Sequence, residues 1–134
     1  MNRYLEFHDS TLSSIEDLDG VVRIYLSPAI IHQRQGELAV NGGTVWLQDV
    51  EIVVPEGSFR EKNVVFPSSI SDGSLKHGDN HFENIVEIPF SGQEDAEIQF
   101  VIPGPSIEYV VVRGKGVAIN IIGEPLYLED FPSC

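Results

Sequence analysis

Residues 17–26, DLDGVVRIYL, contain the clearest turn and strand signals in the chain. Asp19-Gly20 stands between two apolar runs, and an Asp-Gly pair is typical of a tight hairpin turn because glycine adopts positive φ at low cost. After the turn, Val22, Ile24 and Leu26 alternate with other side chains, so that they share one face of an extended segment. The pattern predicts a half-buried antiparallel strand that begins at a hairpin.

Short apolar runs of the same kind recur along the chain and end at glycine, proline, asparagine or aspartate. They occupy residues 44–54, 83–90, 96–102, 107–112 and 117–122. A spacing of roughly 8–12 residues between strands favours an all-β fold, and we expect an antiparallel β-sandwich or barrel of about 8–10 strands. Leu126–Phe131 is a candidate for one short terminal helix. Pro28 removes a backbone donor, so the strand that contains Leu26 is expected to continue beyond it as a bulged or redirected strand.

The 134 residues correspond to about one domain, 1–134, which is long enough to bury a core of its own. Residues 55–82 differ in composition from the rest, because they are rich in Gly, Ser, Pro, Lys, Asp and Asn around the short apolar run Val64-Val65-Phe66. We expect a long loop excursion there that carries one brief edge strand.

Acidic residues far outnumber basic ones. Eight Lys and Arg stand against 21 Asp and Glu, which gives a formal net charge of −13. Such a charge repels nucleic-acid phosphates and anionic membranes, so neither is an expected partner. The hydrophobic fraction of 42% is that of a globular domain and higher than that of disordered acidic chains.

The sequence also bears on the compartment of the protein. No apolar run has the length of a signal peptide or of the roughly 18 residues that a spanning helix needs. Cys134 is the single cysteine, which argues against an internal disulfide and against a cysteine-based zinc site. A cytoplasmic location is therefore expected.

Residues 77–81, His-Gly-Asp-Asn-His, form the most suggestive chemical cluster. In an extended segment His77, Asp79 and His81 would project to the same side and offer two imidazoles and a carboxylate to a metal ion, with Asp72 upstream as a fourth ligand. The alternative, which the lack of strand propensity favours, is a flexible polar loop.

Three other clusters have structural readings that we prefer to functional ones. Residues 7–11, Phe-His-Asp-Ser-Thr, contain a hydroxyl and an imidazole, but neighbours on a strand alternate faces, so a strand that ends in an Asx or Ser/Thr turn is expected. His32-Gln33-Arg34-Gln35 beside Glu37 would line a pocket mouth or form a solvated turn. Gly114-Lys115-Gly116 is too short for a phosphate loop, and a hairpin turn is expected.

Residues 7–12, followed by an isoleucine, a turn and an alternating strand, resemble small acidic all-β bacterial proteins of uncharacterised or immunity-protein-like families. The tail, Gly116-Val117-Ala118-Ile119-Asn120 with Gly123-Glu124-Pro125 and a closing Leu-Glu-Asp-Phe, is similar to the ends of such proteins. The resemblance implies no catalytic residue. It implies protection by binding a partner rather than turnover.

The leading hypothesis is therefore a non-enzymatic protein-binding module, an acidic inhibitor or immunity-type protein for a basic partner, with no cofactor. The first alternative is a small metal-dependent hydrolase that uses His77, Asp79 and His81. The second is a ligand-binding barrel or a homodimer formed through Val64-Val65-Phe66 or Val110-Val111-Val112, which are apolar on both faces.

Overall fold

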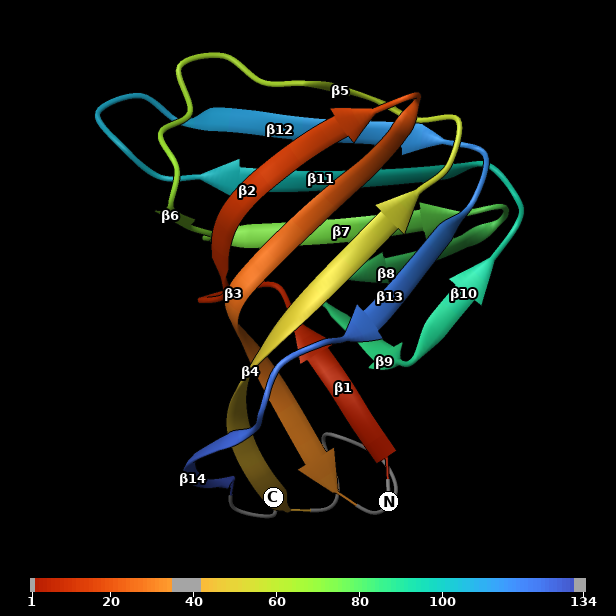
Figure 1. The fold of residues 1–134 in the computed structure, drawn as a ribbon. Coiled ribbons are helices and arrows are strands. Elements are labelled where there is room, and N and C mark those ends of the chain that lie inside the picture. The colour runs from red at the N-terminus through yellow and green to blue at the C-terminus, as the bar shows by residue number, and fades with distance from the viewer. Residues whose placement is uncertain (1, 35–41, 132–134) are drawn as a thin grey trace.

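The chain folds into two antiparallel sheets in a computed structural model, which describes residues 2–34 and 42–131 (Figure 1). Within those ranges there are fourteen strands and no helix, and every strand pair is antiparallel. None of the described residues thus belongs to a helix of the length and apolar character needed to cross a membrane.

The strands divide into a larger and a smaller sheet. The larger sheet contains β1 (Asn2–Glu6), β2 (Thr11–Leu18), β3 (Val21–Arg34), β4 (Gly43–Val54), β6 (Ser68–Ser69), β9 (Ile85–Ile88), β10 (Phe90–Gly92), β13 (Val117–Ile121) and β14 (Leu126–Phe131). The smaller sheet has the order β5 (Ser58–Arg60), β12 (Glu108–Gly114), β11 (Ala96–Ile102), β7 (Asp72–His77) and β8 (Asn80–Glu83). The two sheets do not close into a barrel, so the predicted sandwich is confirmed and its barrel alternative is not observed.

Two long strands, β3 and β4, run through the larger sheet and extend beyond the smaller one (Figure 1). The first half of β3 pairs with β2, and its second half pairs with β1. The change occurs at Ser27 and Pro28, where the register between β3 and β4 shifts. The redirection expected at Pro28 is therefore confirmed. In the same way β4 pairs with β13 over its second half and with β14 over its first half.

The main core lies between the smaller sheet and the part of the larger sheet that faces it. Val22, Ile24 and Leu26 are fully buried, as their alternation predicts. They belong to one apolar cluster with residues of the smaller sheet such as Phe100 and Val112. Apolar side chains buried to this extent each contribute about 1.5–3 kcal/mol to folding.

Two expectations about local structure are wrong. Leu126–Phe131 is a strand, because pairing with β4 supplies hydrogen bonds that local sequence does not reveal. Residues 55–82 are only partly loop: no strand covers 64–66, whereas β5 to β7 and most of β8 fall within the segment. The total of fourteen strands in the described part exceeds the expected number because several have only two to four residues.

Strand β7 was not evident from sequence because Gly73 weakens its strand pattern. The structure shows why glycine stands there, since a Cβ atom at residue 73 would lie 2.6 Å from the Cβ of Phe7. Phe7 is fully buried and packs edge-to-face on Phe100, with 5.5 Å between ring centroids. The glycine therefore makes room for an aromatic side chain that joins the two sheets.

We expect Gly73→Ala to lower the free energy of unfolding by about 1–3 kcal/mol, because the added methyl group forces Phe7 out of its position. The matched control is Gly104→Ala, where the nearest atom is 3.3 Å from the new Cβ, and a change within about 0.5 kcal/mol is expected. Urea unfolding measures both. Equal stability of the two variants would contradict the packing role of Gly73.

Candidate functional site

The residues predicted to bind a metal lie on a hairpin that separates them. Gly78, with φ of 58°, and Asp79 form the turn between β7 and β8, and Lys76 pairs with His81 while His77 pairs with Asn80. Directly paired residues share a face, so His77 and His81 point to opposite faces. Residues 77–81 therefore do not form the extended segment that the metal hypothesis requires. No group of three His, Cys, Asp or Glu side chains suited to a metal ion occurs among the described residues.

Both histidines have structural partners instead. Nε2 of His77 accepts a hydrogen bond from the backbone N–H of Glu94 at 3.2 Å, and its ring packs against Phe90. Nε2 of His81 lies 2.8 Å from a carboxylate oxygen of Glu83. Asp72, considered as a fourth ligand, is at the far end of β7, where its Oδ1 accepts the N–H of Gly73.

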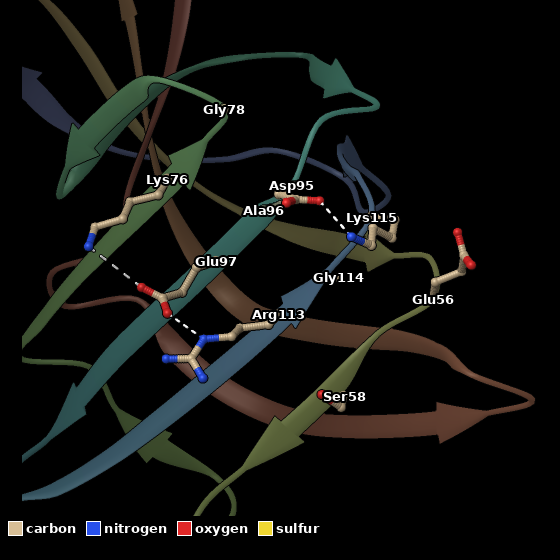
Figure 2. Close-up of a pocket in the computed structure, with 10 residues that line it drawn as sticks. All are labelled: Glu56, Ser58, Lys76, Gly78, Asp95, Ala96, Glu97, Arg113, Gly114 and Lys115. Atoms are coloured by element: carbon tan, nitrogen blue, oxygen red, sulfur yellow. Dashed lines mark hydrogen bonds and ion pairs between the residues drawn. The ribbon is translucent and has the colours of Figure 1, made fainter.

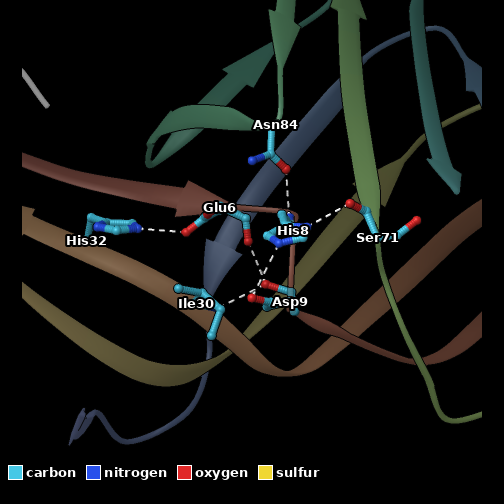
Figure 3. A network of polar contacts seen from close by, with 8 residues as sticks. Glu6, His8, Asp9, Ile30, His32, Ser71 and Asn84 are labelled. Carbon is cyan, nitrogen blue, oxygen red and sulfur yellow. Dashed lines mark hydrogen bonds and ion pairs between the residues drawn. The ribbon is translucent and has the colours of Figure 1, made fainter. Parts of the chain in front are cut away.

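Residues 7–10 form a corner that connects β1, β2, β3 and the start of β7 (Figure 3). The fully buried hydroxyl of Ser10 donates to the carbonyl oxygen of Glu6 at 2.6 Å and accepts the N–H of Ile30 at 2.9 Å. The N–H of His8 donates to Oδ1 of Asn84 at 2.7 Å. The hydroxyl is thus committed to the backbone, which agrees with the structural reading of this cluster.

The imidazole of His8 points to the other side of the corner. Its Nδ1 lies 2.7 Å from the carbonyl oxygen of Ser71, and its Nε2 lies 3.4 Å from a carboxylate oxygen of Asp9. The bond to the Ser71 carbonyl raises the pKa of His8, desolvation opposes this, and the carboxylates of Asp9, Glu6 and Asp72 raise the pKa further. The side chain is about half exposed.

A Ser10→Ala variant should lose about 1–3 kcal/mol of unfolding free energy, because the partly buried N–H of Ile30 keeps no acceptor in place of the hydroxyl. Ser106→Ala, at an exposed position, is the control and should change stability by no more than about 0.5 kcal/mol. Chemical denaturation distinguishes them. A stability loss no larger than that of the control would show that the Ser10 hydroxyl does not support the corner.

His8 should make stability depend on pH. A raised pKa means that the folded state binds the proton more tightly, so the stabilisation is complete below the unfolded pKa of about 6.5 and is lost as pH rises through the folded pKa. The difference in unfolding free energy between the wild type and His8→Gln should therefore shrink from about pH 6 to about pH 8. Urea titrations across this range test it, and a pH-independent difference would contradict it.

The outer face of the smaller sheet carries a hollow of about 500 Å³ in which charges are paired (Figure 2). Glu97 lies between Arg113, at 2.6 Å, and Lys76, at 3.7 Å. Its hydrogen bond with Arg113 lowers the pKa of Glu97 against the opposing effect of burial, so this carboxylate stays ionised and is unsuited to act as a general acid. Asp95 pairs with Lys115 at 3.0 Å.

Gly114-Lys115-Gly116 does not form the expected hairpin turn. It connects β12 in the smaller sheet with β13 in the larger one. A Cβ atom at residue 114 would lie 2.4 Å from Cγ1 of Val54, so the glycine permits the close crossing between sheets. The segment therefore carries the chain from one sheet to the other, which its spacing in the sequence did not reveal.

The polar cluster at the end of β3 is buried. His32 is 5% exposed and its Nε2 lies 2.8 Å from Oε1 of Glu6, while Arg34 is 1% exposed with its guanidinium over the ring of Tyr4. These two residues therefore neither line an open pocket mouth nor form a solvated turn. Gln33, between them in β3, is partly buried, whereas Gln35 and Glu37 lie outside the described residues, as does Cys134.

Sequence reasoning missed an exposed apolar surface around β14. Leu126, Tyr127 and Leu128 are 64%, 50% and 48% exposed, and Ile122, just before the strand, is 53% exposed. The other members of this β14 surface are its acidic residues, Glu124, Glu129 and Asp130. The run Leu-Tyr-Leu before Glu-Asp is visible in the sequence. Its exposure is not, because it depends on how far β4, with which β14 pairs, extends beyond the smaller sheet.

The β14 surface is at an edge of the larger sheet. Within the described ranges β14 pairs with β4 alone, and Figure 1 shows it at the end of the molecule distant from β5. The ring of Tyr127 packs edge-to-face on Trp46, with 5.4 Å between centroids. Its hydroxyl donates to Oδ1 of Asp130 at 2.7 Å, which raises the pKa of Tyr127. The strand is therefore held in a defined position although its side chains are exposed.

The fold defines a β-sandwich-like, all-β protein in which the ends of β3 and β4, flanked by β1 and β14, extend beyond the smaller sheet (Figure 1). Comparison of the chain with protein-family models, with curated proteins and with solved structures gives no match. Function is therefore inferred from the geometry and charge of the chain.

Proposed function

We propose that this protein is a non-enzymatic protein-binding module that holds a basic partner along β14. The observation that carries the proposal is the exposure of Leu126, Tyr127 and Leu128, each about half or more accessible, on one edge strand. Contiguous exposed apolar side chains with polar residues around them are typical of interaction sites. A binding role is also what the resemblance to immunity-type proteins implies.

An edge strand offers backbone groups as well as side chains. Because β14 has a neighbour on one side only among the described strands, a partner segment can add as a further strand. Soluble proteins commonly protect such edges with lysine, proline or covering loops. β14 itself contains neither lysine nor proline and its side chains are apolar or acidic, although its pairing with β4 shifts register between Tyr127 and Glu129. Its surface therefore favours pairing with another chain.

The charge of the strand selects the kind of partner. Residues 117–131 contain Glu124, Glu129 and Asp130 and no lysine or arginine. A basic segment would pair with these carboxylates, and the net charge of −13 would attract it from a distance. Antiparallel pairing of two copies would instead bring both sets of carboxylates into one interface, where like charges oppose association. A basic partner is thus preferred to a homodimer.

The acidic charge also indicates a biological role. An acidic module that covers a cationic effector would act as an inhibitor or as an immunity-type protein, and a cytoplasmic location is consistent with the single cysteine. The metal-dependent alternative loses support because the β7–β8 hairpin separates His77 from His81. The ligand-binding barrel loses support because the sheets stay open.

The test is affinity capture from a lysate of the source organism at low and high salt, with mass spectrometry of the retained proteins. We expect a basic partner whose retention falls at high salt, and we expect Leu126→Ser with Leu128→Ser to reduce retention by about tenfold or more, as the loss of central apolar contacts does. Leu18→Ser, at a side chain 68% exposed on the β2–β3 hairpin, is the control and should retain the partner.

A second pair of variants separates local from overall charge. Glu124→Lys with Glu129→Lys should weaken capture, whereas Asp17→Lys with Glu87→Lys, exposed positions on other strands, makes the same change in net charge and should have a smaller effect. Capture that is unaffected by the Leu126 and Leu128 substitutions, or reduced equally by both lysine pairs, would refute the assignment of β14 as the binding strand.

A further inference from the structure

The side chain of His77 lies where the chain crosses from one sheet to the other. β10 belongs to the larger sheet and β11 to the smaller one, and residues 93–95 connect them. The imidazole packs edge-to-face on Phe90 of β10, with 5.4 Å between ring centroids. A Cβ atom at residue 92 would overlap the imidazole, so Gly92 makes room for it. His77 therefore joins the β7–β8 hairpin to the segment on which the crossing begins.

The hydrogen bond to Nε2 of His77 fixes the protonation state of the imidazole. The donor is the backbone N–H of Glu94, at 3.2 Å. A backbone N–H only donates, so Nε2 must carry a free lone pair and no proton. The rings of His8 and His81 face carbonyl or carboxylate oxygens instead, which a protonated imidazole also satisfies. The His77 bond, in contrast, exists only with the neutral ring protonated at Nδ1.

Charged groups surround the His77 ring on several elements. Among the described residues, those on its own side are Asp79 in the hairpin turn, Glu94 and Asp95 in the connection, and Lys115, which pairs with Asp95 at 3.0 Å. Lys76 and Glu97 pair with one another across β7 and β11 and point to the opposite face. A protonated ring would be attracted by the three carboxylates and repelled by Lys115 and by the N–H of Glu94.

We propose that His77 is a pH-sensitive latch between the β7–β8 hairpin and the β10–β11 connection. With the ring neutral, Nε2 accepts the N–H of Glu94 and holds residues 93–95 on the hairpin. An imidazole takes up a proton from solvent between about pH 8 and pH 5, and Nε2 then becomes a donor that faces another donor. The hydrogen bond is lost, and the connection is released from the hairpin as the pH falls.

Release of the connection changes the hollow on the outer face of the smaller sheet. Gly78, Asp95 and Lys115 are among the residues that line this hollow (Figure 2). Asp95 follows Glu94 directly, and its carbonyl oxygen accepts the N–H of Gly78 at 2.9 Å. Its bond to Gly78 and its ion pair with Lys115 therefore depend on the position of the same segment. The latch thus connects protonation of His77 to the shape of the hollow, a role separate from partner binding along β14.

NMR of the full chain between about pH 8 and pH 5 tests the latch. At the upper end, the ring nitrogen signals of His77 should show a proton on Nδ1 and none on Nε2. As the ring titrates, the protection factor of the Glu94 amide, which corrects for the intrinsic effect of pH on exchange, should fall by about tenfold or more. The amide of Phe100, in the middle of β11, is the internal reference and should keep its protection.

Two variants separate His77 from the other imidazole of the hairpin. In His77→Gln the side-chain oxygen can accept the N–H of Glu94 but does not titrate, so protection of the Glu94 amide should no longer depend on pH. His81→Gln removes the imidazole that pairs with Glu83 and should keep the pH dependence of the wild type.

Any of three results would overturn the proposal. The first is a ring protonated at Nε2 at the upper end of the pH range. The second is protection of the Glu94 amide that does not change while the His77 ring titrates, which would mean that Asp95, through Gly78 and Lys115, holds the connection without the imidazole. The third is a pH dependence that persists in His77→Gln. The first two are measured on the wild-type chain, so the test does not depend on the stability of the variant.

Discussion

The hydroxyl group of Ser10 connects the strands that the fold brings together at one corner. β1 and β2 lie along the same edge of β3, one after the other, and the corner at residues 7–10 must leave that edge and return to it. Ser10 closes the corner by bonding to Glu6 and to Ile30 at the point where β3 changes partner. The same corner exchanges backbone hydrogen bonds with Ile70, and it places Phe7 against Phe100 of the smaller sheet. A buried donor left unsatisfied there would therefore weaken the sheet edge and the packing between sheets together.

The redirection of β3 also determines which surfaces remain open. Beyond Pro28, β3 and β4 continue past the smaller sheet, and β14 pairs with the part of β4 that extends (Figure 1). The smaller sheet covers Val50, Ile52 and Val54 of β4, whereas Leu126 and Leu128 lie on a strand that it does not reach. The exposed apolar strand is thus a consequence of strand length, and its position follows from the register that Ser27 and Pro28 set.

Sequence periodicity predicted those parts of the fold that depend on local residues. The turn at Asp19-Gly20 and the buried face of Val22, Ile24 and Leu26 follow from glycine conformation and alternation alone. Leu126–Phe131 could not be assigned, because its strand conformation depends on β4, which is remote in sequence. The strand at Asp72–His77 depends on Phe7, which makes glycine necessary at residue 73. The extended geometry assumed by the metal hypothesis is not observed for a related reason: Gly78 permits a turn between His77 and His81, and a pattern of ligands along an extended chain does not include that turn. The acidity of residues 117–131 was visible in the sequence, but the exposure of their apolar side chains was not.

The distribution of charge separates two physical contributions to binding. On the smaller sheet, Glu97 pairs with both Lys76 and Arg113, and Asp95 pairs with Lys115, so that these charges largely offset one another at a distance. The acidic residues around β14 have no lysine or arginine in their own segment, and their field adds to that of the whole chain. Charges of this kind mainly accelerate encounter with a basic partner and are screened by salt. In the proposed complex, the apolar contacts of Leu126, Tyr127 and Leu128 would act only at contact, and they would therefore govern how slowly a bound partner leaves. The net charge would bring a partner to the molecule, whereas the extension of β3 and β4 beyond the smaller sheet would determine where it is held.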